Sequence, residues 1–285
     1  MPATHVNSYY AATANDDTRY PALRGTETAD VCVVGGGFSG IATALSLAER
    51  GYQVAVLEAE RVGWGASGRN GGQMIAGISG ELRLESQLGE AGRRLLADIR
   101  YLGNDIIERR VARHEIQCDL KRGWMEVAAR PRHMAAMRAY VEERRKAGDG
   151  DTLEIVEPGD MPRVIGTSLY HGAMLDRRSG HLHPLNLCLG EARAAAGLGV
   201  RIFEESPVTE VVGGDRPFAA TAAGRVEARS IVLAGMTDPR FQTGPLRGLL
   251  FPTGSYIVAT APLPEPVASE ISPEDLAVAD SNVVL

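Results

Sequence analysis

The spacing of apolar residues changes twice between positions 30 and 58. These changes predict a strand, a helix and a second strand. Val31–Val34 form a continuous apolar run, as a strand buried on both faces requires. The next apolar residues recur at helical spacing and are Ile41, Ala44, Leu45 and Ala48. Gly51 then provides a left-handed stop before the second run, Val54–Leu57. Two buried strands joined by one helix predict a right-handed crossover unit.

The rest of the chain shows further helical and strand patterns. Residues 1–29 are mostly polar, and we expect an extended lead-in whose tyrosines pack on the body. Helices are predicted over 90–113, over 131–146 and from Pro184 to Gly197 or Gly199. The predicted β-structure comprises a hairpin over 115–128 with its turn at Arg122-Gly123, strands over 169–175, 200–203 and 254–262, and a meander over 216–234.

Composition excludes some classes of protein. A net charge of −6 and a pI of about 5.6 argue against a nucleic-acid surface. We expect no membrane span and no signal peptide, and therefore a cytoplasmic protein. Cys32, Cys118 and Cys188 are scattered and odd in number, which favours reduced core thiols over a disulfide or a metal site.

Three glycines follow the first predicted strand at a spacing that suits a dinucleotide. Gly35 allows a tight turn, Gly37 lets the backbone approach a pyrophosphate, and Gly40 lets the helix pack close to the sheet. The free N–H groups at the start of that helix favour phosphate. Glu58 ends the second strand, where a carboxylate can accept both hydroxyls of an adenosine ribose. Strand, helix, second strand and acid together predict dinucleotide binding.

Residues 59–73 are too rich in glycine for a regular element and poor in the charge of a solvated linker. Such density of small residues indicates that backbone comes close to something flat or charged. Arg61 and Ser67 could reach phosphate oxygens, and Asn70 and Gln73 could hydrogen-bond a heteroaromatic ring. A mobile glycine-rich loop is the alternative interpretation.

At this point the sequence resembles a known family. GGGFSG, the strand end at Glu58, ERVGWGASGRNGGQ and the later GHLHP are similar to the FAD-dependent glycine/D-amino-acid oxidase (DAO) family, in its gamma-glutamylputrescine-oxidase-like branch. ASGRNGGQ is the most specific segment, because it separates this branch from NAD-binding Rossmann proteins. The resemblance implies an α/β fold with a discontinuous Rossmann-type FAD-binding domain over 28–85 and 170–240. A lead-in over 1–27 precedes it, and 86–169 with 241–285 would form a second, α+β substrate domain on a mixed sheet.

The resemblance also implies cofactor contacts that spacing alone does not. Val208 would hold the adenine through its main chain, and the strand end at Ala234 and Gly235 would reach the FAD. His181 and His183 could ligate a metal or move protons, but a structural entry to the following helix is favoured. The full set of expected cofactor contacts is Gly35, Gly37, Phe38, Ser39, Gly40, Glu58, Ala59, Arg61, Gly65, Ala66, Ser67, Arg69, Asn70, Gly71, Gly72, Gln73, Val208, Ala234 and Gly235. We assign no catalytic side chain and no metal.

The implied reaction is oxidation of the C–N bond of a small amine or amino acid. A hydride would pass from the carbon beside a neutral amine to flavin N5, the imine would hydrolyse to an aldehyde and ammonia, and molecular oxygen would become hydrogen peroxide. Three alternatives stay open: an FAD-dependent dehydrogenase that reduces a quinone or carrier, an NAD(P)-dependent dehydrogenase, and an inactive flavin-binding remnant. Family members normally continue past Leu285, so we expect a missing C-terminal part and poor oxidase activity of this chain alone.

Overall fold

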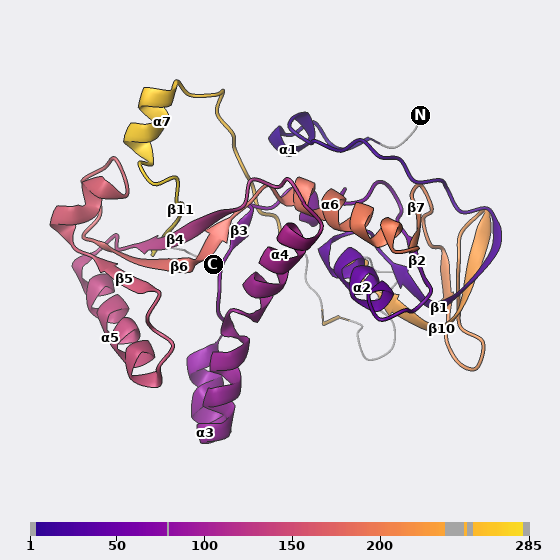
Figure 1. Cartoon of the computed structure of the whole chain (residues 1–285), viewed down its shortest axis with the longest axis horizontal. Helices are drawn as coiled ribbons and strands as arrows, with labels where there is room; N and C mark the ends of the chain where they lie inside the picture. Colours follow the sequence, from indigo (N-terminus) through magenta and orange to yellow (C-terminus); the bar gives the residue numbers. More distant parts are fainter. Residues whose placement is uncertain (1–3, 79, 237–247, 250–252, 282–285) are drawn as a thin grey trace. The chain divides into compact units, whose positions relative to one another are not determined.

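The computed structural model describes residues 4–78, 80–236, 248–249 and 253–281, and the chain divides into two units with one sheet each (Figure 1). The first unit comprises Met1–Gly71, Arg110–Cys118 and His183–Val258. The second comprises Gly72–Arg109, Asp119–Leu182 and Ala259–Leu285. The chain passes from one unit to the other after Gly71, Arg109, Cys118, Leu182 and Val258, so these limits differ from the domain boundaries expected above.

The sheet of the first unit has six strands. Their order is β7 (Arg201–Phe203), β2 (Val54–Leu57), β1 (Gly25–Val34), β10 (Gly224–Leu233), β9 (Phe218–Ala220) and β8 (Glu210–Val212). The pairs β7–β2, β2–β1 and β1–β10 are parallel, whereas β10–β9 and β9–β8 are antiparallel. The predicted strand–helix–strand unit therefore lies in the middle of the sheet, where parallel strands are buried on both faces.

Burial of β1 on both faces follows from its alternating side chains. Val31 and Val33 belong to a core cluster with residues of α2 (Phe38–Ala48) and α6 (Pro184–Gly197), which cover one face of the sheet. Cys32 and Val34 point to the opposite face and pack in a second cluster. Cys32, Cys118 and Cys188 are all buried, as the sequence indicated, and no disulfide joins them.

The N-terminal segment is more structured than the polar pattern suggested. It contains a short helix, α1 (Tyr9–Ala12), and enters β1 already at Gly25. Tyr10 and Tyr20 pack against the core cluster that includes α6, as expected, whereas Tyr9 is 56% exposed. His183 is the N-cap of α6: its Nδ1 accepts a hydrogen bond from Asn186 N at 3.1 Å. Its Nε2 lies 3.0 Å from Thr13 Oγ1, so the structural interpretation of this histidine is confirmed.

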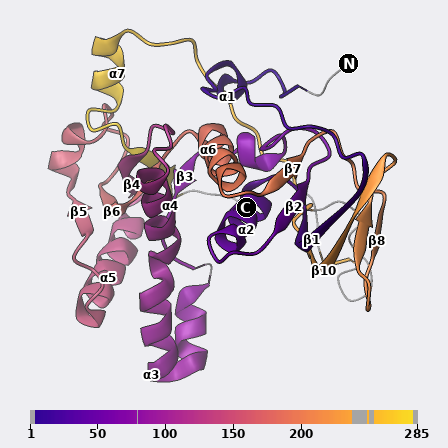
Figure 2. The same cartoon turned by 45° about the vertical axis from the view of Figure 1, so that its right-hand side comes forward.

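The second unit contains a mixed sheet, as predicted. Its order is β11 (Ala277–Asp280), β4 (Lys121–Val127), β6 (Ala173–His181) and β3 (Gln73–Met74), and β5 (Leu153–Val156) also pairs with β6. β11 and β4 are parallel and the other pairs are antiparallel. Figure 2 shows α5 (Pro131–Ala147) beside β5 and β6. The remaining helices of the described chain are α3 (Glu81–Arg100), α4 (Leu102–Arg113), α7 (Glu265–Ile271), and the 3-10 turns η1 (Ala66–Gly68) and η2 (Pro158–Arg163).

Several of the helices and strands predicted between residues 90 and 262 were wrong in type or in bounds. The expected hairpin over 115–128 is one strand, β4, because Gly123 (φ +111°) forms a bulge rather than a turn. The helix expected over 90–113 begins at Glu81, bends at Gly89 and is divided after Arg100. The strand expected from Leu169 begins at Ala173. The segment 253–260 has no strand, and the run ending at Leu285 lies outside the described residues.

Among the residues that the structure describes, no helix has the length and apolar character needed to cross a bilayer.

Candidate functional site

The turn between β1 and α2 has room only for glycine at two positions. Gly35 has φ +111°, and a Cβ on it would lie 2.6 Å from the carbonyl oxygen of Ala234. A Cβ on Gly40 would lie 1.9 Å from the carbonyl oxygen of Gly35. The first glycine therefore permits the close approach of the β10 end to the turn, and the second permits the close packing of α2.

Gly37 presents bare backbone at the start of α2. It is the N-cap of this helix and has no side chain to satisfy the first N–H groups. Ser67 partly fills that role, because its Oγ accepts a hydrogen bond from Phe38 N at 2.9 Å. A Cβ on Gly37 would lie 2.8 Å from the same Oγ. The free N–H groups and the helix dipole together favour an anion here.

Glu58 lies beside the same turn and is held by backbone groups. Its Oε2 accepts a hydrogen bond from Gly36 N at 2.6 Å, and its Oε1 accepts one from Glu60 N at 2.9 Å. Burial raises the pKa of this carboxyl, whereas the N–H groups of Glu60 and Gly36 act in the opposite direction. Each carboxylate oxygen can accept more than one hydrogen bond, so both remain able to receive a ribose hydroxyl.

A cavity of about 350 Å³ opens along these residues within the first unit. It runs past the ends of β1, β2 and β10, the edge at which α/β sheets bind ligands. Ten of the residues expected at the cofactor line it: Gly35, Gly37, Glu58, Ala59, Gly65, Ala66, Ser67, Val208, Ala234 and Gly235. The expected contacts from four sequence segments thus come together around one space: the turn after β1, residues 58–67, Val208, and Ala234–Gly235.

Arg61 is expected at a phosphate, but the structure engages it elsewhere. Its Nε lies 3.1 Å from both carboxylate oxygens of Glu204, and its Nη2 donates to the carbonyl of Thr18 at 2.9 Å. Glu204 is fully buried and also accepts from Val62 N at 2.8 Å and from Tyr20 N at 3.1 Å. This ion pair ties the loop after β2 to the end of β7, which explains Arg61 without a phosphate.

Arg69 and Asn70 stabilise the turn that carries Ser67. Arg69 Nε donates to the carbonyl of Trp64 at 2.7 Å, and its guanidinium lies 4.1 Å from the centre of the Trp64 ring. Its Nη2 is buried, and none of the described residues hydrogen-bonds to it. Asn70 Nδ2 donates to the carbonyls of Ala66 at 3.0 Å and Ser67 at 2.9 Å.

The remaining expected contacts do not line the cavity. Phe38, Ser39 and Gly40 belong to the first turn of α2. Gly71 ends this stretch of the first unit, and Gly72 and Gln73 belong to the second. Within that second unit, Gln73 Oε1 accepts from Trp124 Nε1 at 3.2 Å.

Five residues that line the cavity were not predicted as contacts: Val34, Leu57, Glu60, Trp64 and Met236. Val34 and Leu57 are the last residues of β1 and β2. They directly precede Gly35 and Glu58, so the sequence could have indicated that they line the cavity. Trp64, a large side chain between two glycines, was another. Met236, with φ +55°, gives no such signal in the sequence.

The family model for FAD dependent oxidoreductases (DAO) matches residues 30–284. The chain belongs to this family. The match confirms the resemblance seen in the sequence, and with it FAD as the cofactor. Gamma-glutamylputrescine oxidoreductase of Escherichia coli is 37% identical over 99% of this chain and 66% of its own length. The probable oxidoreductase OrdL of Haemophilus influenzae is 38% identical over 99% of this chain and 67% of its own length. The chain thus spans about two thirds of the length of these relatives.

Solved structures show the same fold. An L-amino acid deaminase of Proteus vulgaris, with its specific insertion deleted, matches with a TM-score of 0.62 and 24% identity, over 81% of this chain and 58% of that one. Glycine oxidase of Geobacillus kaustophilus matches with a TM-score of 0.59 and 24% identity, over 76% and 58% of the two chains. The predicted fold class, a Rossmann-type α/β unit with a second unit on a mixed sheet, is confirmed.

The cavity suits the family's cofactor. Gly37 lines the cavity and presents backbone without a side chain to it, as a bound pyrophosphate requires. Glu58 would accept hydrogen bonds from the adenosine ribose, and Val208 lines the same cavity. These residues would hold the dinucleotide part of FAD.

We expect Glu58→Gln to weaken FAD binding by about 1.5–3 kcal/mol, the usual contribution of a hydrogen bond to a charged group. The amide would also place an N–H₂ group against the N–H of Gly36 or Glu60, which now donate to the carboxylate. Titration of apoprotein with FAD measures the change. Glu210→Gln, at an exposed position of β8, is the matched control. Equal dissociation constants for Glu58→Gln and wild type would show that Glu58 does not bind the ribose.

Proposed function

We propose that this chain belongs to an oxidoreductase that acts on a small amine or amino acid, with gamma-glutamylputrescine as the model substrate, and that its first unit binds the FAD. The observation that carries the proposal is the cavity formed by the glycine turn, Glu58 and the Gly65–Ser67 segment. It occurs in a chain that is 37% identical to a gamma-glutamylputrescine oxidoreductase.

The residues of this chain would bind and orient rather than react. The backbone at Gly37 and the start of α2 would hold the pyrophosphate, and Glu58 the adenosine ribose. Bound FAD would supply the hydride acceptor for the carbon beside the amine, with molecular oxygen as the proposed final electron acceptor. Hydrolysis of the resulting imine would give an aldehyde and ammonia, with hydrogen peroxide as the second product. No side chain is needed as a dedicated base, because a neutral amine already favours loss of hydride.

The test is the visible spectrum of the purified chain, before and after anaerobic addition of amines. We expect a flavin band that bleaches with gamma-glutamylputrescine, and not with the corresponding alcohol. Mixing the reduced protein with oxygen or with a quinone then identifies the acceptor: fast reoxidation by oxygen supports an oxidase, and reoxidation only by the quinone replaces it with a dehydrogenase. A chain that binds flavin without any amine-dependent bleaching would overturn the proposed activity.

A further inference from the structure

The N-terminal segment, residues 4–23, is bound to the first unit by specific hydrogen bonds. Its helix α1 lies beside α6 (Figure 1). Asn15 N donates to Asn186 Oδ1 at 3.1 Å, and Asn15 Nδ2 donates to the carbonyl of Gln117 at 2.6 Å. These bonds connect one residue of the segment to two distant parts of the same unit. They fix the course of a mostly polar stretch that has few apolar side chains to bury.

The segment also contacts the loop after β2, residues 59–70, which we call the Trp64 loop. Trp64 Nε1 donates to the carbonyl of Thr4 at 3.0 Å. Arg61 Nη2 donates to the carbonyl of Thr18 at 2.9 Å. Both acceptors are backbone carbonyls, so these bonds depend on the path of the N-terminal segment rather than on its side chains. The segment therefore holds the Trp64 loop at two points.

His5 adds a side chain to this contact. Its imidazole is half-buried. Burial and the charge of Arg61 lower the pKa of His5, whereas the charge of Glu204 raises it. The ring thus lies near the buried ion pair that anchors the Trp64 loop, and its neutral form adds no further positive charge beside Arg61. The N-terminal segment meets the loop through this ring as well as through its backbone.

The Trp64 loop connects these contacts to the cofactor cavity. Trp64 and Ser67 both line the cavity. Gly63 N donates to the carbonyl of Gly36 at 2.9 Å, so the loop is bonded to the glycine turn directly before Trp64. Ser67 Oγ accepts from Phe38 N at the start of α2. One short loop therefore contacts the proposed phosphate site and the N-terminal segment.

Glycine makes this loop dependent on contacts outside itself. Gly63, Gly65 and Gly68 interrupt it, and each glycine loses more conformational freedom on ordering than any other residue. A loop that samples several conformations binds a ligand only in the fraction that has the right one. The apparent dissociation constant rises as that fraction falls. An element that holds the loop would tighten binding without touching the ligand.

We propose that the N-terminal segment is a positioning element of the FAD site. By holding Trp64 and the Arg61–Glu204 ion pair, it keeps the Trp64 loop in the conformation that binds the cofactor. Trp64 is a positioning residue in this arrangement, because its indole N–H transmits the effect of the segment to the loop. The inference rests on the proposed placement of FAD in the cavity of the first unit.

Deletion of residues 2–7 tests this role. It removes the Thr4 carbonyl and His5 but keeps Ser8, the N-cap of α1. Titration of apoprotein with FAD should show a dissociation constant raised about two- to tenfold, the range that one hydrogen bond contributes. Deletion of residues 2–3, which keeps Thr4, is the matched control and should leave the constant unchanged. In apoprotein, the longer deletion should also speed hydrogen exchange over residues 61–70 and leave exchange in β9 unchanged.

Trp64→Phe tests whether the effect passes through the indole N–H. Phenylalanine keeps an aromatic ring but cannot donate to Thr4. We expect a similar rise in the dissociation constant in the full chain. In the chain that lacks residues 2–7 the substitution should cause little further rise, because the hydrogen bond is already lost there. Tyr52→Phe, at an exposed aromatic residue of the same unit, is the control and should bind FAD as the wild type does.

Two results would overturn the positioning role. One is wild-type affinity after deletion of residues 2–7, and the other is an equal effect of Trp64→Phe in both chains, which would mean that Trp64 acts independently of the segment. A melting curve identifies a deletion variant that fails to fold, and an unchanged dissociation constant in Trp64→Phe then overturns the role. The titrations need no amine. FAD binding without amine-dependent bleaching therefore overturns the proposed activity alone, and wild-type FAD affinity after the deletion overturns only the positioning role.

Discussion

Gly37→Val is expected to yield a folded protein without bound FAD. A Cβ at position 37 would lie 2.8 Å from Ser67 Oγ, which now accepts from Phe38 N. The serine hydroxyl must therefore move, and the cap of α2 is lost with it. The two methyl groups of valine would occupy the space that a pyrophosphate needs. Gly37 has φ −87°, a value that valine adopts without strain, so the backbone can stay in place.

The measurement is the ratio of flavin to protein absorbance after purification, followed by titration of apoprotein with FAD. We expect at least about a tenfold rise in the dissociation constant. Gly197→Val, at the end of α6, is the matched control, because a Cβ there meets nothing within 4 Å. Far-ultraviolet circular dichroism of both variants verifies the fold. Wild-type affinity in Gly37→Val would mean that the phosphates bind elsewhere in the molecule.

The first unit was predictable because its signals are local. Gly35, Gly37 and Gly40 act within one turn, and Glu58 is the first residue after β2. The apolar runs of β1 and β2 indicate strands that are buried on both faces. Such strands lie in the middle of a parallel sheet, as β1 and β2 do. Val208 and Ala234 required the family resemblance, since nothing in their own segments shows which strand end reaches the turn.

The second unit was less predictable because its determinants are not local. Gly123 lies in the middle of β4, and a glycine there suits a turn and a bulge equally until the partner strand is known. Gln73 follows the glycine-rich segment directly in sequence, yet it pairs with His181 in the other sheet. Only long-range pairing distinguishes these outcomes.

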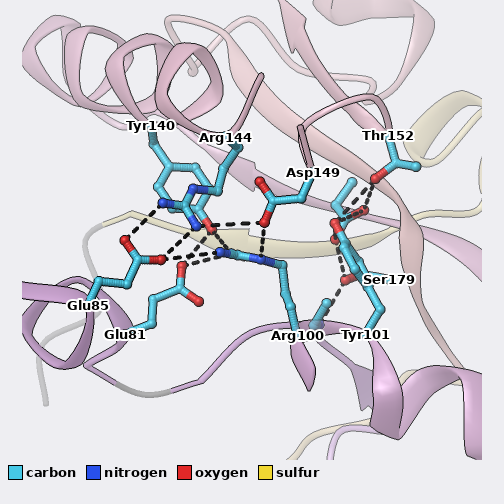
Figure 3. A network of polar contacts seen from close by, with 11 residues as sticks. Glu81, Glu85, Arg100, Tyr101, Tyr140, Arg144, Asp149, Thr152 and Ser179 are labelled. Carbon is cyan, nitrogen blue, oxygen red and sulfur yellow. Dashed lines mark hydrogen bonds and ion pairs between the residues drawn. The ribbon is translucent and has the colours of Figure 1, made fainter. Parts of the chain in front are cut away.

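Arg144 shows a different limit of prediction from the sequence. It extends the buried stripe of α5 that includes Met137 and Val141, so spacing alone places it in the core. A charged residue at the end of a helix is usually solvated, and the sequence does not reveal which acids would meet it. Glu85 on α3 and Asp149 after α5 supply them. A charged residue on an otherwise apolar stripe was the available signal for the network in Figure 3.

Arg144→Ala is expected to destabilise the second unit by about 3–5 kcal/mol, the usual cost of removing one partner of a buried ion pair. Glu85 would lose both hydrogen bonds to its carboxylate and, among the described residues, keep Arg100 Nη2 at 3.9 Å and the weaker charge of Arg93. Urea denaturation followed by hydrogen exchange in α5 reports on this unit specifically. Arg93→Ala, which removes an exposed pair with Glu90, should cost less than about 1 kcal/mol.

The same network predicts how acid acts on the second unit. Hydrogen bonds from Arg144, and the charge of Arg144 and Arg100, hold the pKa of Glu85 below its usual range, although burial opposes this. A carboxyl whose pKa is lower in the folded state contributes stability above its unfolded pKa, about 4.3, and that contribution is lost as the pH falls through the folded value. We therefore expect the stability of α5 to decline below about pH 4.3 in the wild type. In Arg144→Ala this decline should be smaller, because the main cause of the shift is gone. An equally steep decline in both proteins would mean that carboxyls other than Glu85 govern acid unfolding of this unit.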